Sequence, residues 1–391
     1  MMTHGNPTHK KAMRERIHLE EIMRKIGIIL PLVGLLLLLG LTGCEREITG
    51  NVERADISST SCFDCHSDSD QDLTVARIQY ENSVHEAGEN VNRNHLYGGF
   101  YGGCEKCHTN EGFLANLTGG SAGDVSFTAI SCFTCHAPHS TGDLGLRIES
   151  DVTLANGVAF TLGDSRLCAS CHQSRRNAST YVTDDLELST HYGPHYSNQA
   201  DMLLATNAYE YAGYTYSSSY HAAVSDGCVT CHMSTSLHES VGGHSWNMRN
   251  EERHFENTFG CNIDACHRGN LDSLNRLAES DFDLDGAIEG VQDEIRGLSD
   301  SLRSLLLDAN LLEYVAADEA YEPVDGREVA TADSVGALYN WLFVHEDRSH
   351  GIHNTEYAVD LLQSSINFLI TGSPSGTMEP QGDIARVLSA H

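Results

Sequence analysis

Positive charge is scarce in this chain of 391 residues. The sequence has 24 Lys and Arg against 55 Asp and Glu, which gives a formal net charge of −31 at pH 7. Nucleic acids and anionic lipid surfaces bind proteins through basic patches, so this composition argues against both as partners. A basic partner protein or metal cations would suit the charge, although solubility alone also explains it.

A nearly uninterrupted apolar run lies near the N-terminus, at residues 26–41, directly after the basic residues 24–25. Its length is close to the minimum for a membrane-spanning helix, so an uncleaved anchor is one interpretation. Pro31, Gly34 and the small residues that precede Cys44 favour a cleaved secretory signal instead. We therefore expect the chain to be exported.

The ending Leu-Thr-Gly-Cys of this segment resembles a bacterial lipobox. The resemblance implies that residues 1–43 are removed and that Cys44 is lipidated and becomes the mature N-terminus. Lipidation adds more than one acyl chain, which is enough for stable anchoring, and Glu45 in place of an aspartate implies the outer membrane, on its periplasmic or surface face. Residues 1–22 are unusually polar for a signal peptide, whereas a signal peptide that began at Met23 would have ordinary proportions. Cleavage would make the chain more acidic, because the removed segment has more basic than acidic residues.

Cysteine, in contrast, is abundant and regularly placed. All thirteen cysteines except Cys44 fall into six pairs, and a histidine follows each pair directly. Five pairs have the spacing C-x-x-C-H of c-type haem attachment, and the sixth has four residues between its cysteines, a spacing that multihaem cytochromes also use. The two thiols add to the haem vinyl groups, and the histidine becomes the proximal iron ligand. The pairs are Cys62 and Cys65, Cys104 and Cys107, Cys132 and Cys135, Cys168 and Cys171, Cys228 and Cys231, and Cys261 and Cys266. The predicted proximal ligands are His66, His108, His136, His172, His232 and His267.

Zinc sites and disulfides are the alternatives for these cysteines. Zinc ribbons pair two C-x-x-C knuckles around one metal, but nothing in them requires a histidine after every second cysteine. A disulfide framework has no use for those histidines either. The repeated pattern therefore favours six covalent c-type haems.

The ligand at the second axial position decides what a haem iron can do, and twelve further histidines of the mature chain could supply it. Four stretches resemble parts of bacterial multihaem cytochromes c, a family that carries electrons across the periplasm or outside the cell. They are Ser131–His139, Ser218–His221, Gly242–His244 and Asp347–Asn354, and the last is shared loosely with multihaem proteins of the nitrite reductase type. The resemblance spans Cys62 to Leu362, and its haem motifs are more specific than its distal-ligand motifs.

This resemblance implies bis-histidine ligation of the irons. The implied distal ligands are His85, His139, His195, His221, His244 and His353. The next candidates are His95, His191 and His350. Met202, Met233 or Met248 could replace a histidine, although Met233 directly follows a proximal ligand and cannot reach the opposite face of that haem, and nothing singles out the other two.

Composition divides the mature chain near residue 270. The first part holds all six haem motifs and is rich in Gly, Ser, Tyr, His and Asn. With about 35 residues for each haem, it is too small for an ordinary hydrophobic core, so covalently held porphyrins would take that place. We expect a mainly α fold with extensive coil, in which a haem-organised multihaem cytochrome c core precedes a C-terminal helical region. The predicted segments are a signal at 1–43, a linker at 44–57, the haem domain at 58–270, the helical region at 271–371 and a tail at 372–391.

Apolar residues at helical spacing predict three helices in the C-terminal region. The predicted helices are Asp293–Leu312, Ala332–His345 and Thr355–Ile370.

An acidic stretch at residues 281–289 reads D-x-D-x-D-G-x-I-E and matches five positions of an EF-hand type calcium loop. Gly286 would allow the sharp turn, whereas position 12, usually a bidentate glutamate, is Gln292. The alternative is an acidic helix N-terminus stabilised by the macrodipole. The candidate calcium ligands are Asp281, Asp283, Asp285 and Glu289.

These observations favour electron transfer through six haems in a lipid-anchored chain, with other cytochromes or redox proteins as partners. Bis-histidine irons have no open position for a substrate. The first alternative is a multihaem reductase of nitrite, hydroxylamine or a sulfur oxyanion, which needs a five-coordinate haem; the C-x-x-C-K motif of nitrite reductases of this type is absent. The second is a subunit of a conductive cytochrome filament, against which lipidation at Cys44 weighs. An electron carrier is thus favoured over an enzyme.

Overall fold

The computed structural model describes residues 71–376, with the exception of 89–90, 92–102, 121, 123–125 and 142. The described residues belong to one structural unit, which spans residues 56–391. The predicted signal, Cys44, the first haem motif at Cys62–His66 and the candidate His95 lie outside the described residues. Within the described part of the chain, no helix is both long enough and apolar enough to cross a membrane.

The fold is mixed, with helices as the main element and strands that are few and short. The α-helices are α2 (Gln71–Tyr80), α3 (Val84–Ala87), α5 (Glu105–His108), α6 (Asn110–Leu117), α7 (Cys132–Cys135), α8 (Pro138–Thr141), α9 (Arg166–Ala169), α10 (Ala178–Tyr181), α11 (Gln199–Leu203), α12 (Gly227–His232), α13 (Val291–Asp308), α14 (Ala332–Asp347) and α15 (Thr355–Thr371). The 3-10 turns are η3 (Gly163–Ser165), η4 (Tyr220–Ala223) and η5 (Gly243–Ser245).

The strands form antiparallel pairs and no larger sheet among the described residues. The pairs are β1 (Val152–Thr153) with β2 (Ala159–Phe160), β3 (Leu186–Glu187) with β8 (Glu328–Val329), β4 (Arg249–Asn250) with β5 (Phe255–Glu256), and β6 (Leu312–Val315) with β7 (Ala320–Pro323).

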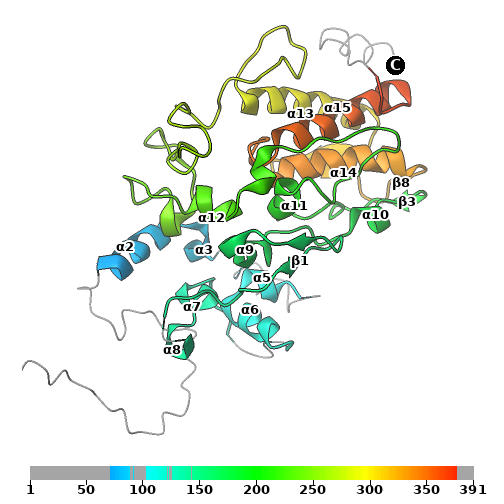
Figure 1. The fold of residues 1–391 in the computed structure, drawn as a ribbon. Helices are drawn as coiled ribbons and strands as arrows, with labels where there is room; N and C mark the ends of the chain where they lie inside the picture. Colours follow the sequence, from blue (N-terminus) through cyan, green and yellow to red (C-terminus); the bar gives the residue numbers. More distant parts are fainter. Residues whose placement is uncertain are drawn as a thin grey trace, which may run out of the picture. The chain divides into compact units, whose positions relative to one another are not determined.

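The long helices α13, α14 and α15 pack against one another, as Figure 1 shows in yellow, orange and red. The predictions for the second and third of them are confirmed to within two residues. Their starting points follow from side-chain caps that accept backbone N–H groups. Thr331 Oγ1 accepts from the amide of Ser334, and Asn354 Oδ1 accepts from the amide of Tyr357.

The first predicted helix, Asp293–Leu312, was wrong at its end. The helix α13 begins at Val291 and ends at Asp308. Asn310 has a left-handed backbone with φ +53°, which terminates the helix, and Leu312 begins β6. The apolar pattern continues through this turn because Leu312 still faces the same core, with 2% of its surface exposed. Periodicity alone therefore could not locate the end of the helix.

The largest hydrophobic core of the described residues lies among these three helices. Leu298 and Leu302 of α13, Trp341 and Phe343 of α14, and Leu362 of α15 are almost completely buried in it. Burying a side chain of this size contributes about 1.5–3 kcal/mol, so the C-terminal region has an ordinary source of stability.

Part of the predicted haem domain is fastened to this helical core. Met202 lies in the same hydrophobic cluster and is fully buried. The Asn198 side-chain amide donates to the Phe343 carbonyl at 2.7 Å, and buried Asn340 both accepts from and donates to the backbone of Tyr209, at 2.9 Å each. Residues from both sides of the predicted boundary at 270 therefore share one core.

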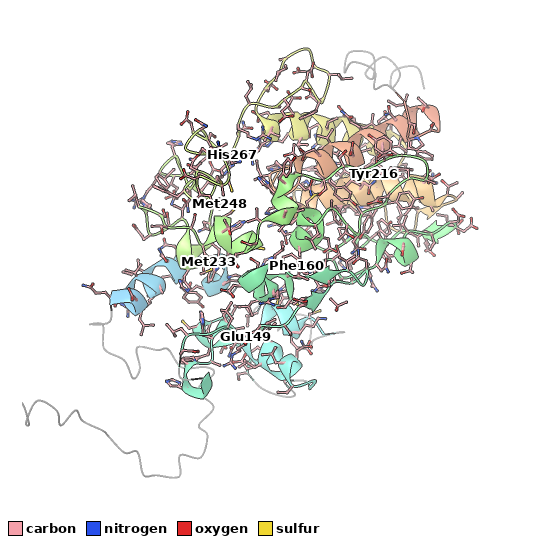
Figure 2. The ribbon with its side chains drawn as sticks, in the orientation of Figure 1. Glu149, Phe160, Tyr216, Met233, Met248 and His267 are labelled. Carbon is pink, nitrogen blue, oxygen red and sulfur yellow. The ribbon has the colours of Figure 1, made fainter. Side chains whose placement is uncertain are left out.

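The remaining part of the predicted haem domain buries much less apolar surface. Its hydrophobic cluster is small and consists of Leu154, Phe160, Ala169, Ala200 and Leu203. Phe160 lies near the middle of Figure 2, among short helices and irregular segments. The described motif cysteines around this cluster are half-buried or exposed.

Candidate functional site

In three of the described C-x-x-C-H motifs, a tight backbone turn places the histidine beside the cysteines. In each of them, the backbone N–H of the histidine donates to the backbone carbonyl of the first cysteine. The bonded residues are His108 and Cys104 (3.2 Å), His136 and Cys132 (2.9 Å), and His172 and Cys168 (2.8 Å). In the fourth described motif of this spacing, both cysteines and His232 lie on the single helix α12.

The sixth motif closes in the same way despite its two additional residues. The N–H of His267 donates to the carbonyl of Cys261 at 3.0 Å. The inserted residues loop outward, with Ile263 43% exposed. The wider spacing therefore leaves His267 next to Cys261, as in the shorter motifs.

Each of the five described proximal histidines faces one predicted distal histidine from a different part of the chain. The five separations between ring centres fall in a narrow interval, from 6.1 to 6.4 Å. The pairs are His108 with His195 (6.1 Å), His136 with His244 (6.3 Å), His172 with His85 (6.1 Å), His232 with His353 (6.1 Å) and His267 with His221 (6.4 Å).

This separation fits two imidazoles bound to opposite sides of one metal ion. Metal–imidazole bonds of about 2.0–2.1 Å, as for zinc, place the two ring centres about 6.3 Å apart. Aromatic rings in simple contact span about 4.5–7 Å, so a single pair at this distance would carry little weight. Five pairs in one narrow interval, each joining a predicted proximal to a predicted distal residue, all match the spacing that a shared metal would give.

The sixth predicted distal ligand, His139, lies against Phe133, with ring centres 5.8 Å apart. The remaining proximal histidine, His66, is outside the described residues, so no sixth pair can be assigned. Among the other candidates, His191 is exposed and His350 is half-buried. Met202 belongs to the hydrophobic core, and Met233 and Met248 lie around α12 in Figure 2.

The surroundings of the paired histidines keep most of them neutral at pH 7. Burial, with smaller effects from neighbouring cations and histidines, lowers the pKa of His85 to about 4, of His195 to about 3 and of His232 to about 4. A neutral imidazole has the lone pair that a metal requires. His353 differs, because burial lowers its pKa but the Asp347 carboxylate, together with a smaller effect of Cys228, raises it, so that the net shift is upward.

In five of the paired histidines Nδ1 is engaged by an oxygen atom, which leaves Nε2 available as a ligand. The Nδ1 partners are the carbonyl of Leu144 for His136 (2.7 Å), the carbonyl of Ile352 for His221 (2.7 Å), the carbonyl of Trp246 for His232 (2.8 Å), Gln199 Oε1 for His172 (3.3 Å) and Asp347 Oδ1 for His353 (2.6 Å). These contacts fix the orientation of each ring before any metal binds.

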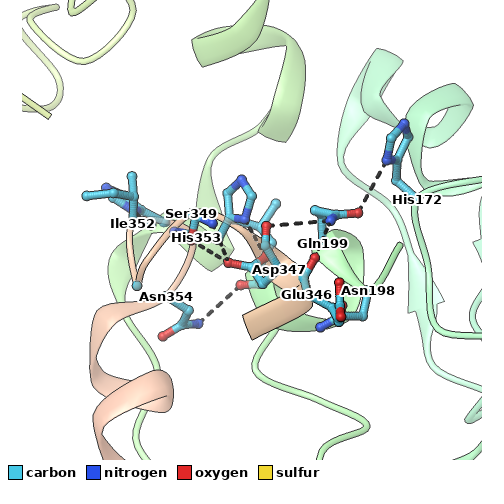
Figure 3. Close-up of polar contacts among 12 residues, drawn as sticks. His172, Asn198, Gln199, Glu346, Asp347, Ser349, Ile352, His353 and Asn354 are labelled. Carbon is cyan, nitrogen blue, oxygen red and sulfur yellow. Dashed lines mark hydrogen bonds and ion pairs between the residues drawn. The ribbon is translucent and has the colours of Figure 1, made fainter. Parts of the chain in front are cut away.

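The loop between α14 and α15 supports histidines of two motifs directly. It carries His353, which faces His232, and its Ile352 carbonyl accepts from His221, which faces His267. Figure 3 shows this loop. The C-terminal helical region therefore does more than close the fold, because it places groups beside the predicted haem sites.

Gln199 links the same loop to a third motif. Its side-chain nitrogen donates to the carbonyls of Glu346 (3.1 Å) and Asp347 (3.5 Å), and its oxygen lies 3.3 Å from Nδ1 of His172. These contacts are the dashed lines around Gln199 in Figure 3. A single amide thus connects the proximal histidine of one motif to the end of α14.

Two features fix the backbone of this loop. Gly351 has φ +86°, and a Cβ atom there would lie 2.7 Å from Cγ1 of Ile295 on α13. Asn354, which is fully buried, accepts from the amide of Ser219 at 2.9 Å and donates to the Leu203 carbonyl at 3.2 Å. The loop is consequently anchored on both sides.

Sequence reasoning missed Trp246. Its ring centre lies 4.7 Å from that of His85 and 5.8 Å from that of His244, while its carbonyl accepts from His232. One residue therefore contacts histidines of three predicted haem sites. The available signal was its position two residues after His244, in a chain with only two tryptophans.

Arg175 was also missed. Its guanidinium lies 3.2 Å from Nε2 of His108, the nitrogen that a metal would bind, and 3.8 Å from the sulfur of Cys104. If a metal bound between His108 and His195, the Arg175 guanidinium would have to move away from Nε2. It could then neutralise an anionic group of a bound haem.

Thiols of different motifs lie in direct contact. Neighbouring thiols shift each other's pKa in opposite directions, and these pairs join the second motif to the fourth, the fourth to the fifth and the fifth to the sixth. The pairs are Cys107 with Cys171, Cys168 with Cys228, and Cys231 with Cys261. The four motifs therefore follow one another in space as a chain of attachment points.

The acidic loop brings together three of its four predicted calcium ligands. One carboxylate oxygen from each of Asp281, Asp283 and Asp285 lies within 4.8 Å of the others. Burial and the neighbouring carboxylates raise the pKa of Asp283 to about 6. Glu289 is exposed and does not join this cluster. Instead, the fully buried Glu294 carboxylate accepts from three loop amides, including that of Glu289 at 2.8 Å.

Comparison with known proteins gives no relative from which the function could be transferred: no family model matches the chain, and neither a curated protein nor a solved structure shows significant similarity to it.

Proposed function

We propose that this protein is a hexahaem c-type cytochrome of the bis-histidine type, which transfers electrons. The observation that carries the proposal is the set of five histidine pairs with ring centres 6.1–6.4 Å apart. In each pair, one member directly follows the cysteines that would hold the porphyrin. Haem iron would supply a one-electron Fe(III)/Fe(II) couple at these positions.

The pairing favours electron transfer over the reductase alternative. A histidine on each side of the iron leaves no position where nitrite, hydroxylamine or a sulfur oxyanion could bind. The Nδ1 contacts to carbonyls and side chains hold five of these rings in place, which disfavours their displacement by a substrate. The protein's residues would therefore bind and orient the cofactors without forming a substrate site there.

The contacts between motif cysteines support a continuous path. Cys107 lies next to Cys171, and Cys231 lies next to Cys261. Porphyrins attached at neighbouring motifs would therefore be bound through neighbouring sulfur atoms. Electron transfer between cofactors weakens steeply with distance, and this arrangement keeps successive haems close. It suits passage of electrons from one end of the set to the other.

Export and a lipid anchor at Cys44 belong to the same proposal. They are supported by the apolar segment at 26–41 and the Leu-Thr-Gly-Cys ending. The acidic surface suits other cytochromes or basic redox proteins as partners and disfavours nucleic acid. A filament of such subunits is less compatible with a lipid at the N-terminus.

Purified protein tests the proposal. Intact-mass measurement should show six haem additions and loss of residues 1–43, and electron paramagnetic resonance (EPR) should show only low-spin ferric signals. Five haems would point to the sixth motif, at Cys261 and Cys266. A high-spin haem in the native protein, above all one that turns over nitrite or hydroxylamine, would contradict the electron carrier and favour the reductase.

His244→Ala and His238→Ala form a matched pair for the same test, since both residues precede β4. Only His244 faces a proximal histidine, whereas His238 lies against Phe255. We expect one high-spin haem in the first variant and an unchanged spectrum in the second.

Calcium is the second cofactor that we propose, at the loop of Asp281, Asp283 and Asp285. The proposal is supported by the convergence of the three carboxylates and by the loop pattern. The absence of Glu289 from the cluster reduces the number of protein ligands, which suits weak binding.

A further inference from the structure

The partner of Nδ1 differs in charge among the paired histidines. His136, His221 and His232 donate to backbone carbonyls, and His172 contacts a side-chain amide. These partners are neutral. His353 alone among the described pairs has a carboxylate partner, Asp347, at 2.6 Å, which is also the shortest of the five contacts. One predicted haem site therefore has a different electrostatic environment from the others.

The Asp347 carboxylate is buried and held in position. Only 2% of its surface is exposed, and its Oδ2 accepts from both the hydroxyl and the amide of Ser349. The Ser349 hydroxyl oxygen in turn accepts from the amide of His353 at 3.2 Å. Among the described residues, Asp347 forms an ion pair with His353 and with no other residue. Figure 3 shows the carboxylate between Ser349 and the imidazole.

A carboxylate at this place changes the imidazole as a ligand. It attracts the Nδ1 proton, so that electron density rises at Nε2 and the ring approaches an imidazolate. A more strongly donating ligand stabilises ferric iron more than ferrous iron, and hydrogen bonding around the ligand is one of the means by which a protein sets haem potential. Charge-assisted hydrogen bonds are about twice as strong as neutral ones, so the carbonyl partners have a smaller effect.

We propose that Asp347 lowers the reduction potential of the haem attached at Cys228 and Cys231 through the Nδ1 of His353. This inference rests on the proposed hexahaem function. It makes Asp347 a positioning and tuning residue for one haem. The other described haem sites lack an equivalent carboxylate at Nδ1.

The location of this haem gives the tuning a consequence. Cys228 contacts Cys168 of the fourth motif, and Cys231 contacts Cys261 of the sixth. The haem between them is therefore an internal member of the chain of sites. A lowered potential there raises the energy of an electron on that haem and creates a barrier inside the path.

The test is Asp347→Asn in the full-length haem-loaded protein, compared with Asp333→Asn. Asparagine retains an oxygen that can accept from His353 but removes the charge. Asp333 lies on the same helix. It accepts from the Tyr209 hydroxyl at 2.6 Å, and this bond involves no paired histidine. In a spectroelectrochemical titration at fixed pH, the reduction potential of one haem in Asp347→Asn should rise by about 59 mV. This corresponds to about a tenfold change in the equilibrium constant for its one-electron reduction. The Asp333→Asn titration should match the wild type.

Additional measurements separate the failure of this inference from failure of the proposed function. Haem content and spin state should be unchanged in Asp347→Asn, with six haems, all low-spin. Unchanged potentials in a fully loaded variant would overturn the role of Asp347 while leaving the cytochrome intact. A wild-type protein without covalent haem would instead overturn the proposed function.

If Asp347→Asn loses haem, the wild-type protein supplies the second test. Its EPR spectrum should contain one low-spin signal whose g values indicate stronger axial donation than the rest, and His353→Ala should remove that signal alone. Equivalent signals from all haems would count against the inference.

Discussion

The described chain combines two regions that bury very different amounts of apolar surface. Around α13, α14 and α15, large side chains such as Trp341, Tyr357 and Leu298 are almost completely inaccessible. Around α5, α7 and α9, Phe113, Phe133 and Ala169 are among the few buried apolar residues. The first region can fold as ordinary proteins do, whereas the second needs an additional source of stability. Covalently attached porphyrins would provide it.

This difference assigns different consequences to substitutions in the two regions. A core substitution in the helical region should lower stability and disturb the sites that its loops support. A substitution of a paired histidine should change one cofactor and leave the fold intact.

Trp341→Ala should have the largest effect. The side chain is 1% exposed, its indole N–H donates to the Ser299 carbonyl at 3.1 Å, and it stacks on His345 with ring centres 4.8 Å apart. We expect a loss of about 3–5 kcal/mol in the free energy of unfolding, measured by denaturant titration. Leu237→Ala, at a residue that is 85% exposed, is the control. Equal stability of the two variants would mean that the helices are not the core of the fold.

Glu346→Gln should give the next largest effect, in the pH dependence of stability. The carboxyl group is buried at the end of α14, and burial, against the opposing effect of Arg348, raises its pKa from 4.5 to about 7. The folded state therefore favours the protonated acid. Its contribution to stability is complete below pH 4.5 and is lost as the pH rises through 7.

The free energy of unfolding should be measured from about pH 4 to about pH 8. Over this range it should fall by about 3 kcal/mol more in the wild type than in Glu346→Gln. Glu313→Gln, an exposed carboxylate of β6, should follow the wild type. Parallel curves for wild type and Glu346→Gln would mean that the carboxyl group is solvated.

His353→Ala and His221→Ala should each alter one of the six proposed haems. These histidines face His232 and His267, respectively, and His353 comes from the helical region whereas His221 precedes α12. Each variant should contain one high-spin haem and bind carbon monoxide or cyanide at one site, as followed by EPR and optical spectroscopy. Unaltered spectra would contradict the pairing, and loss of all low-spin signals would contradict the independence of the sites.

The smallest effect should come from the acidic loop between the two regions. Calcium at tenfold above its dissociation constant would stabilise the protein by about 1.4 kcal/mol. Chelation should therefore lower the melting temperature of the wild type, and Asp283→Ala should abolish this dependence. Glu289→Ala, which removes an exposed carboxylate outside the cluster, should preserve it. Identical melting curves with and without chelator would leave the three carboxylates as a helix-capping feature.

The sequence predicted the parts of this molecule that depend on local spacing. The apolar residues indicated α14 and α15 closely, because α14 is buried on nearly all sides, α15 is buried along a broad face, and both have a capping residue at their start. They did not indicate β6, because Leu312 remains buried after the chain has left the helix. The short strand pair β3–β8 was also beyond local reasoning, since its strands come from residues about 140 apart in the chain.

The candidate site shows the same limit. The cysteine motifs and the set of distal histidines were accessible from sequence patterns, and the structure brings five of those six histidines opposite proximal ones. Which histidine faces which could not be deduced, because the pairing depends on tertiary folding. Asp347 stood at the start of the stretch that nominated His353, but its carboxylate contact became apparent only in three dimensions.

The contacts between thiols of different motifs constrain how the protein can be made. Exported proteins mature in compartments where neighbouring thiols are readily oxidised to disulfides. In a chain that folded first, Cys107 and Cys171, or Cys168 and Cys228, would meet as free thiols, and a crosslink there would consume the groups that must react with the vinyl carbons. If the chain carries haem as proposed, cofactor attachment would therefore have to precede folding, and the finished structure would constrain the order of these biosynthetic steps.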